Sequence, residues 1–461
     1  MPDLMQDVVS LAKRRGFVYQ GSEIYGGLAN TWDYGPLGVE LLRNIQNLWW
    51  QYFVHRRDDM LGLDTNIFMS PRVWEASGHT RSFTDSLVDC KICKNRKRAD
   101  HLIEEYFQNK GEEIKVEGLT LEELDELIKK HKIPCPKCGG FNWTKPRRFN
   151  LLFETAIGIV TGEKNEVYLR GEIAQGMFVN FKNVLDSFGG RRLPFGLAQS
   201  GKAFRNEVTM GNFIFRTLQF NLSELEYFFD PSKQEWEQLF EYWQEQMWNW
   251  TTKVLGIKEE NLRWRAHTDA ERSHYSKRTE DIEYQYPFGW KEMYGLAYRT
   301  DYDLRNHMEK SGVDLRYTDV ETGNKFIPHV IEPTFGMDRT LLTVLLDSYV
   351  AEEKRTFLKI PVNLAPYKIA VFPLLKNREE LVAKAREVFD FLKESWNVTW
   401  DDRGNIGKRY YSQDEIGTPF CITVDYDTLD KDDVTVRNRD TMDQERVGIN
   451  RLEEYFKDKI C

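Results

Sequence analysis

The feature that most constrains the fold is a pair of short arms, 204–207 and 216–224, joined by a turn-prone segment that contains Met210-Gly211-Asn212. Side chains alternate between the two faces of a strand, so an antiparallel hairpin of these arms would gather arginines, a phenylalanine and acids on one face. Guanidinium groups suit phosphate oxygens, an aromatic ring suits stacking on a purine, and carboxylates suit amines or Mg²⁺. The arms therefore predict a nucleoside triphosphate bound on an antiparallel sheet.

A second candidate phosphate contact lies in the segment 330–339, which is followed by the apolar helix expected at 341–346. Gly336 would allow the backbone to approach a ligand closely, and Arg339 at the start of a helix could point at a phosphate together with the helix N-terminus. Taken alone, the segment is more typical of an exposed Asp338–Arg339 ion pair that caps a core helix.

Four of the six cysteines form two CxxC pairs, Cys90–Cys93 and Cys135–Cys138. This spacing fits tetrahedral thiolate coordination of zinc, and in a chain without a secretion signal it favours metal binding over disulfides. Free thiols in a degenerate insertion are the alternative. The charged, helix-prone stretch 121–130 lies between the pairs, so the block is typical of an insertion with its own metal site.

Composition limits the class of protein. At roughly 150 residues per domain, 461 residues suggest about three domains, and a net charge of −9 means that only a local basic patch could hold a nucleic acid. No apolar run approaches the ~18 residues that span a bilayer, and the first residues carry acids where a signal peptide needs bases. We therefore expect a cytosolic protein with no membrane partner.

The hydrophobic pattern predicts several elements. A helix is expected over 35–54, a strand over 64–69 ending at Pro71, and a helical stripe over 231–254. After Pro361 the pattern alternates between strand and helix, which indicates a separate α/β domain with a parallel-type sheet. Its expected elements are a strand at 369–372, a helix at 378–396, and strands at 399, 421–424 and 434–436.

These segments resemble the three signature motifs of class II aminoacyl-tRNA synthetases, and the wider chain resembles the homodimeric glycyl-tRNA synthetases. The resemblance rests on YGPLG (34–38), ASGHT (76–80), RKRADH (96–101), YLRGEIAQG (168–176), GNFIFRT (211–217), RTDYDL (299–304), VIEPTFGMDR (330–339) and RYYSQDEIGTPFCITVD (409–425). It implies an α+β fold with a six-stranded antiparallel catalytic sheet, a zinc-bearing insertion and a C-terminal α/β anticodon-binding domain. The implied ranges are 1–85 (catalytic core with the dimer motif), 86–147 (zinc insertion), 148–360 (core, with a helical insertion at 231–284) and 361–461 (anticodon binding).

The resemblance also implies roles for single residues. Arg205 would contact the α-phosphate, Phe220 would stack on adenine, and Arg339 would hold the γ-phosphate; together with Glu292, the two arginines form the implied catalytic set. The implied ATP-binding residues are Arg205, Asn206, Glu207, Phe215, Arg216, Phe220, Glu292, Met293, Gly336 and Arg339. The implied glycine-binding residues are Arg98, Glu172, Phe220, Glu224, Glu332, Thr334 and Gly336, and the implied zinc ligands are Cys90, Cys93, Cys135 and Cys138.

The activity implied is the ATP- and Mg²⁺-dependent attachment of glycine to the 3′ end of tRNA(Gly) through a glycyl-adenylate, by a homodimer. Two alternatives stay open at this point. One is a synthetase-like paralogue that binds nucleotide or RNA without charging tRNA, and the other is dinucleoside polyphosphate synthesis as a side activity of the same adenylate chemistry.

Overall fold

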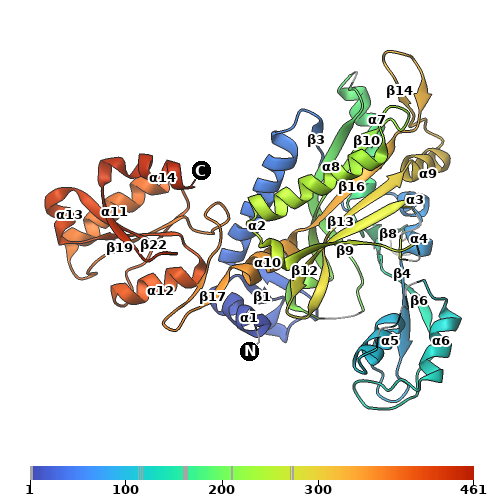
Figure 1. Ribbon diagram of the computed structural model, residues 1–461, viewed down its shortest axis with the longest axis horizontal. Helices are drawn as coiled ribbons and strands as arrows, with labels where there is room; N and C mark the ends of the chain where they lie inside the picture. The colour runs from blue at the N-terminus through green and yellow to red at the C-terminus, as the bar shows by residue number, and fades with distance from the viewer. Residues whose placement is uncertain are drawn as a thin grey trace.

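The computed structural model describes residues 4–460 apart from 113, 115, 117, 159–164, 190, 209, 210, 270, 273 and 274, so Met210 of the expected turn lies outside the described residues. Its centre is a seven-stranded sheet with the order β11-β12-β13-β16-β10-β9-β3 (Figure 1). The strands are β3 (Met60–Gly62), β9 (Phe195–Phe204), β10 (Gln219–Phe229), β11 (Leu262–Ala266), β12 (Arg278–Tyr286), β13 (Gly289–Thr300) and β16 (His329–Gly336). Six of them pair antiparallel, which confirms the expected catalytic sheet, and β3 adds a parallel edge strand beside β9.

The two predicted arms meet in β9 and β10, which pair from Gln219↔Phe204 to Phe228↔Phe195. The predicted arms include residues beyond the paired strands. Strand β9 ends just before Arg205, and Arg216 lies between the 3₁₀ turn η3 (Phe213–Phe215) and the start of β10. Arg205 and Arg216 therefore lie in the loop that joins the two strands, and both line a pocket there.

Three helices cover one face of the sheet (Figure 1): α2 (Pro36–Trp50), α8 (Trp236–Asn249) and α10 (Met337–Ser348). Proline at the first position of α2 suits a helix start, since its missing N–H would have no intrahelical partner. Their apolar sides and that face of the sheet form the largest core, in which Trp49, Trp243 and Trp250 are fully buried. On the opposite face, α7 (Ala174–Ser187) and α9 (Tyr302–Ser311) cover only part of the sheet and leave room for a site.

Two predicted segments differ in the structure. A strand was expected at 64–69, but the structure has its strand earlier, as β3 at Met60–Gly62. Within 64–69 the backbone forms only an isolated bridge between Phe68 and Leu169. The reason is that the Arg170 guanidinium takes the Thr65 carbonyl oxygen at 2.7 Å, an acceptor that a strand partner would use. The 231–284 segment is helical in α8, in the π-helical turn η4 (Trp250–Val254) and in the short turn η5 (Glu259–Asn261), whereas its later part forms edge strand β11 and most of β12, from which Leu262, Ile282 and Tyr284 pack into the core.

The cysteine-bearing block forms a unit of its own beside the main sheet (Figure 1). It contains the sheet β5-β4-β6 and two helices, with β4 (Thr84–Asp89), β5 (Arg96–Arg98), α5 (Ala99–Gln108), α6 (Leu121–Lys130) and β6 (Arg147–Asn150). A capping box of Thr120 and Glu123 starts α6, which occupies the predicted range. A separate apolar core around Leu102, Ile103 and Ile128 holds the two helices together.

The C-terminal unit is a five-stranded sheet with the order β20-β19-β21-β22-β23 and its own core. Its elements are β19 (Ile369–Pro373), α11 (Glu379–Lys393), β20 (Val398–Trp400), α12 (Ile406–Ile416), β21 (Phe420–Val424), α13 (Tyr426–Lys431), β22 (Asp433–Asn438), β23 (Gln444–Gly448) and α14 (Leu452–Ile460). The sheet is mixed: β20, β19 and β21 are parallel as predicted, whereas β22 and β23 are antiparallel. Helix α12 escaped prediction because polar residues, Arg409, Gln413 and Asp414, fill much of its buried side.

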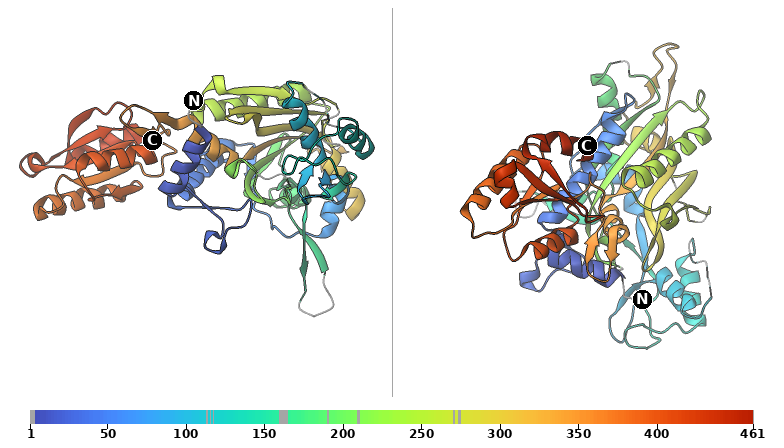
Figure 2. Two further views of the ribbon diagram at one scale, coloured as in Figure 1. Left: turned by 90° about the horizontal axis from the view of Figure 1, so that it is seen from below. Right: turned by 60° about the vertical axis from the view of Figure 1, so that its left-hand side comes forward.

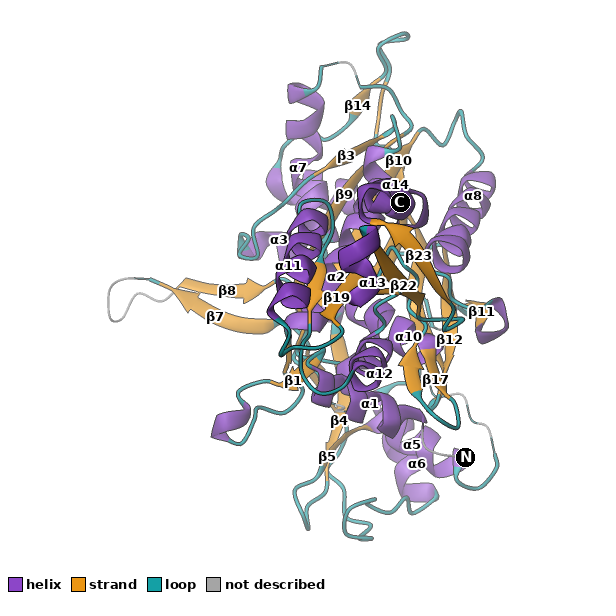
Figure 3. Ribbon diagram, turned by 90° about the vertical axis from the view of Figure 1, so that its left-hand side faces the viewer, coloured by secondary structure: helices purple, strands orange, loops and turns teal. Residues whose placement is uncertain are grey.

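The remaining elements are smaller. They are α1 (Leu4–Arg15), β1 (Val18–Gln20), η1 (Glu23–Tyr25), β2 (Trp32–Tyr34), η2 (Gln51–His55), α3 (Pro71–Ala76), α4 (His79–Ser82), β7 (Phe153–Ile157), β8 (Asn165–Leu169), η5 (Glu259–Asn261), β14 (Tyr317–Thr318), β15 (Lys325–Phe326), β17 (Tyr349–Ala351), β18 (Thr356–Leu358) and η6 (Ile449–Arg451). The β7–β8 hairpin projects away from the body (Figures 2 and 3). Among the described helices, none combines the length and apolarity that crossing a membrane requires.

Candidate active site

A pocket opens at the end of the β9–β10 hairpin, on the side of the sheet away from α2 and α8. It is lined by residues of β10, β13, β16, η3 and the start of α10: Arg205, Glu207, Ile214, Phe215, Arg216, Thr217, Phe220, Asn221, Leu222, Glu292, Met293, Thr334, Gly336, Asp338 and Arg339. Nine of the ten predicted ATP-binding residues lie in this lining, and only Asn206 does not. The combination of three arginines with acids and aromatic rings suits an anionic, aromatic ligand.

Arg339 lies over the ring of Phe215, with its guanidinium carbon 4.5 Å from the ring centroid. Its Nη1 donates to the Glu292 carbonyl oxygen at 2.8 Å and lies 3.1 Å from the carboxylate of the same residue. The positive charge of Arg339 lowers the pKa of Glu292, so this acid is ionised at neutral pH. The first turn of α10 thus presents a guanidinium beside a carboxylate, rather than the isolated exposed ion pair considered as the alternative.

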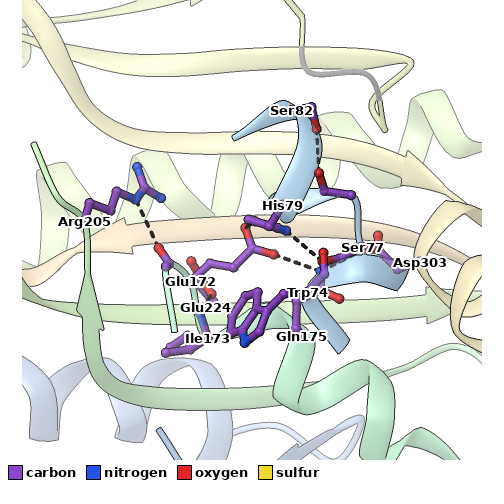
Figure 4. Close-up of polar contacts among 12 residues, drawn as sticks. Trp74, Ser77, His79, Ser82, Glu172, Ile173, Gln175, Arg205, Glu224 and Asp303 are labelled. Carbon is purple, nitrogen blue, oxygen red and sulfur yellow. Dashed lines mark hydrogen bonds and ion pairs between the residues drawn. The ribbon is translucent and has the colours of Figure 1, made fainter. Parts of the chain in front are cut away.

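Arg205 also lines this pocket. Its Nε donates to the carbonyl oxygen of Gly171 at 3.0 Å (Figure 4), and its guanidinium lies about equally far from two rings, 5.1 Å from Phe83 and 5.3 Å from Phe220. These contacts leave the outer guanidinium nitrogens without a hydrogen bond to any described residue. The side chain is therefore oriented before a ligand binds.

Arg216 and Glu207 lie on the same rim. Burial lowers the pKa of Arg216, and the negative charge of Glu207 opposes that shift. One carboxylate oxygen of Glu207, Oε2, is buried without a hydrogen-bond partner among the described residues. An unpaired buried oxygen of this kind is suited to a cation or a ligand hydroxyl group. Asn206 instead uses its backbone N–H to bind the Leu151 carbonyl oxygen at 2.8 Å.

Behind Arg205 lies a buried network of acids (Figure 4). Glu172 Oε2 lies 3.2 Å from His79 Nε2, and Glu172 Oε1 accepts a hydrogen bond of 2.8 Å from Gln175. Burial alone would raise the pKa of Glu172, but the charges of His79 and Arg299 hold it well below its ordinary value. Glu172 is therefore ionised throughout the physiological range.

Two further acids of the network have the opposite behaviour. Burial and the negative charges of its neighbours raise the pKa of Glu224 to about 8, although its Oε2 accepts the Ile173 N–H at 3.0 Å. Burial raises the pKa of Glu332 to about 7 against the attraction of Arg299, whose Nη1 is 2.8 Å from Glu332 Oε2. Thr334 pairs with Glu224 across the strands, so the hydroxyl and both carboxyl groups belong to one site.

Arg299 belongs to the RTDYDL motif but received no predicted role. It is 1% exposed, makes a two-pronged ion pair with Asp303 at 2.7 and 2.9 Å, and stacks 3.9 Å from the Tyr275 centroid. His79, from the ASGHT segment, is likewise a functional candidate that the sequence pattern did not single out. Arg299 lies near the end of β13 and Asp303 in the first turn of α9, so no helical spacing marked this pair in the sequence.

The structure does not bring Arg98 to these acids. Its guanidinium pairs with Asp85 at 3.0 Å and with Asp100 at 2.5 Å, at the edge of the insertion. Burial lowers the pKa of Arg98, but the hydrogen bond and charge of Asp100 and the charge of Asp85 raise it above its ordinary value. The contact of Arg98 with glycine stays a prediction.

The four predicted zinc ligands converge. Their Sγ atoms all lie within 4.8 Å of one another, with 3.6 Å between Cys90 and Cys138 and between Cys93 and Cys135. Four sulfurs brought this close without disulfide bonds are the donor set that a tetrahedral zinc ion requires.

Comparison with known proteins gives a consistent result. Residues 157–349 match the model of the tRNA synthetase class II core domain (G, H, P, S and T), and residues 368–459 match that of the anticodon binding domain. The chain is 51% identical over 461 residues to a glycine–tRNA ligase of Caldanaerobacter subterraneus subsp. tengcongensis, covering 99% of this chain and 98% of the relative. A glycine–tRNA ligase of Geobacillus kaustophilus is also 51% identical, with 99% of each chain covered.

Among solved structures, a prolyl-tRNA synthetase from Cryptosporidium parvum superposes with a TM-score of 0.64 at 15% identity, covering 98% of this chain and 76% of that one. This likeness shows the class II fold alone. Since the full-length identity to the curated relatives is far higher, the chain belongs to the glycine–tRNA ligase family of class II aminoacyl-tRNA synthetases.

Proposed function

We propose that this enzyme activates glycine with ATP and transfers it to the 3′ end of tRNA(Gly), using the residues of the pocket and of the acid network in the roles given below. The observation that carries the proposal is the direct adjacency of two sites. A pocket with three arginines opens beside a buried cluster of carboxylates, which suits a triphosphate next to a small ammonium compound.

In the first step the glycine carboxylate attacks the α-phosphorus of ATP, and pyrophosphate leaves. Arg205 stabilises the charge that develops at the α-phosphate, Arg339 holds the γ-phosphate, and Phe220 stacks on adenine. The tRNA 3′-terminal hydroxyl then attacks the adenylate carbonyl and AMP leaves. No protein nucleophile is required, so catalysis rests on positioning and electrostatics.

Mg²⁺ is expected to enter with ATP and would neutralise charge on its phosphates. The residues that would hold it are Glu207 and Glu292, which offer hard carboxylate oxygens on the pocket rim. The unpartnered Oε2 of Glu207 and the ionised state of Glu292 support this assignment.

Glycine is proposed to bind with its ammonium group toward Glu172, Glu224 and Glu332, with Thr334 and Gly336 at the edge of the pocket. These carboxyl groups fill the space where a β-carbon would project, so a larger amino acid would clash. Arg98, which pairs with Asp85 and Asp100 at the edge of the insertion, is proposed as a further member of this set.

Zinc is proposed as a structural ion on the four cysteines, where it would tie the two CxxC loops of the insertion together. The proposed domain division is 1–85 and 148–360 for the catalytic core, 86–147 for the zinc insertion and 361–461 for anticodon binding. Separate apolar cores in the insertion and in the C-terminal unit support it.

A homodimer is proposed, in the cytoplasm where ATP and tRNA are found. Large apolar side chains are exposed around the projecting β7–β8 hairpin and the η1 loop: Ile24 (89%), Tyr25 (88%), Leu28 (58%), Phe68 (52%) and Ile157 (52%). A second copy would cover such a surface, and closed two-fold symmetry is the commonest arrangement of such oligomers.

The deciding experiment is ATP–pyrophosphate exchange followed by tRNA charging, each with all twenty amino acids. We expect exchange that depends on glycine and charging of tRNA(Gly). Absence of glycine-dependent exchange would favour a paralogue that binds nucleotide or RNA without charging tRNA. Exchange without tRNA charging, together with formation of dinucleoside polyphosphate from ATP, would favour dinucleoside polyphosphate synthesis as the main activity.

A further inference from the structure

Glu226 is a buried acid that the proposed reaction does not use. It lies on β10 two residues after Glu224, so both side chains are on the same face of the sheet. Its residue is 0% exposed, and neither carboxyl oxygen has a hydrogen-bond partner among the described residues. An ionised carboxylate in that situation would be far more costly than a neutral one.

The strand register places Glu226 next to the ammonium-binding acids. On β10 and β16, Glu224 pairs with Thr334 and Tyr227 pairs with Ile331, so Glu226 falls across from Glu332. Directly opposite residues of an antiparallel pair have Cβ atoms roughly 5 Å apart and share a face, and like charges there repel. Of the two, Glu332 has the cationic partner, since Arg299 donates to it at 2.8 Å.

The surroundings of Glu226 offer little positive charge. The charged groups that act on Glu226 come from β10, β13, β16 and α9, and they are Glu332, Arg299, Glu224 and Asp303. Arg299 is committed to Asp303 and Glu332, and His79 to Glu172. Burial and the charge of Glu332 accordingly raise the pKa of Glu226 well above its ordinary value.

We propose that Glu226 is a positioning residue that remains protonated, so that an uncharged carboxyl group beneath the site supports Glu332 as the ionised ligand of the substrate ammonium. In this proposal a protonated Glu226 donates its O–H toward the Glu332 carboxylate across the strand pair, whereas a second negative charge at this place would drive a proton onto Glu332. The inference rests on the proposed glycine site and adds a residue that determines its charge state.

The test compares Glu226→Gln with Glu226→Met in glycine-dependent pyrophosphate exchange. Glutamine keeps an uncharged hydrogen-bond donor of nearly the same shape, whereas methionine keeps the length and loses the donor. We expect Glu226→Gln to have a KM for glycine within about threefold of the wild type and the same pH profile of kcat/KM from about pH 6 to pH 9. Glu226→Met should raise the KM for glycine about tenfold while the KM for ATP changes less than about twofold.

Three results would overturn the inference: a Gln variant as impaired as the Met variant, a Met variant that binds glycine normally, or equal losses toward glycine and ATP. The first would mean that Glu226 acts as an ionised group, and the last that it serves the fold in general. If the wild-type enzyme itself shows no glycine-dependent exchange, the proposed function fails instead, so the two failures are distinguishable.

Discussion

At the scale of single residues, the site is positioned by contacts that exist before any ligand arrives. Arg205 is held by the Gly171 carbonyl and lies between Phe83 and Phe220, and Arg339 is held against Phe215 and Glu292. Preorganised charges of this kind need no rearrangement during the reaction, which is why they stabilise a transition state more effectively than water does.

The first prediction concerns Arg205. Arg205→Ala should lower glycine-dependent pyrophosphate exchange by at least ~10²-fold with the fold intact, because it removes the charge proposed to face the α-phosphate. Arg192→Ala is the matched control, since Arg192 is an exposed arginine paired with Glu321 on the surface. Near-wild-type exchange by the Arg205 variant would show that the α-phosphate contact is elsewhere.

The second prediction concerns selectivity. Every wrong amino acid is larger than glycine, so a site filled by carboxyl groups can reject it by a clash without a hydrolytic editing site. Alanine should support exchange at least ~10³-fold less efficiently than glycine. Glu332→Ala should impair the use of glycine more than that of ATP, measured as separate KM values. Comparable activation of alanine or serine by the wild type would place the glycine pocket on other residues.

The third prediction follows from Glu224. Its folded pKa of about 8 lies above the ~4.3 of an unfolded glutamate, so its contribution to stability is present below the unfolded value and is lost as pH rises through the folded one. Without ligands, Glu224→Gln should therefore raise the melting temperature more at pH 8 than at pH 5, by about 2 °C or more. Glu166→Gln, at an exposed position of β8, is the control. An equal effect at both pH values would contradict a neutral Glu224.

At the scale of elements, the cysteine-bearing insertion depends on the bridge between its two CxxC loops. Its helices α5 and α6 share a small core, and a small core alone supplies little stability. A zinc ion would therefore contribute much of what keeps these loops together.

The fourth prediction is about one zinc per chain in protein prepared without chelator, as four thiolates imply. Cys135→Ser should release the metal and speed hydrogen exchange in α5 and α6, with β9 and β10 unaffected. Cys421→Ser, at a buried cysteine of β21 outside the cluster, should keep the metal. Metal-free protein with four titratable thiols in the insertion would refute the site.

At the scale of the whole molecule, side-chain bonds tie the C-terminal unit to the catalytic core. Asn44 of α2 donates to the carbonyl oxygens of Leu364 and Ala365, both at 3.1 Å. Lys368 donates to three carbonyls of the same linker, those of Val362, Asn363 and Ala365, at 2.8 to 2.9 Å. The linker is thus fixed against the helix that carries the expected dimer motif.

The fifth prediction concerns assembly. Light scattering at micromolar concentration should give a mass of about two chains. Phe68→Asp should shift the equilibrium toward monomers, because it puts a charge on the exposed apolar surface near β8. Phe391→Asp replaces a 40% exposed phenylalanine of α11 in the C-terminal unit and serves as the control. A fully active wild-type monomer would count against the dimer.

The sequence by itself determined the elements whose signals are local. The two arms of the hairpin, helix α6 with its capping box, the CxxC spacing and the apolar stripe of α8 are each readable within some twenty residues, and most of the pocket lining followed from the motif segments. Helix α12 escaped because its buried side is polar: Arg437 and Arg355 each lie within 2.9 Å of Asp414, and these partners come from distant segments.

Tertiary structure alone decided the charge state of the site. The strand register places Glu226 across from Glu332. The packing of α9 on the sheet brings Asp303 into an ion pair with Arg299. The hydrophobic periodicity of a strand predicts which face of the sheet a residue occupies. It does not predict which residue of another strand lies opposite. Since the pKa of a buried acid depends on those neighbours and on burial, the ionisation of Glu172, Glu224 and Glu332 could be derived only once the strands were paired.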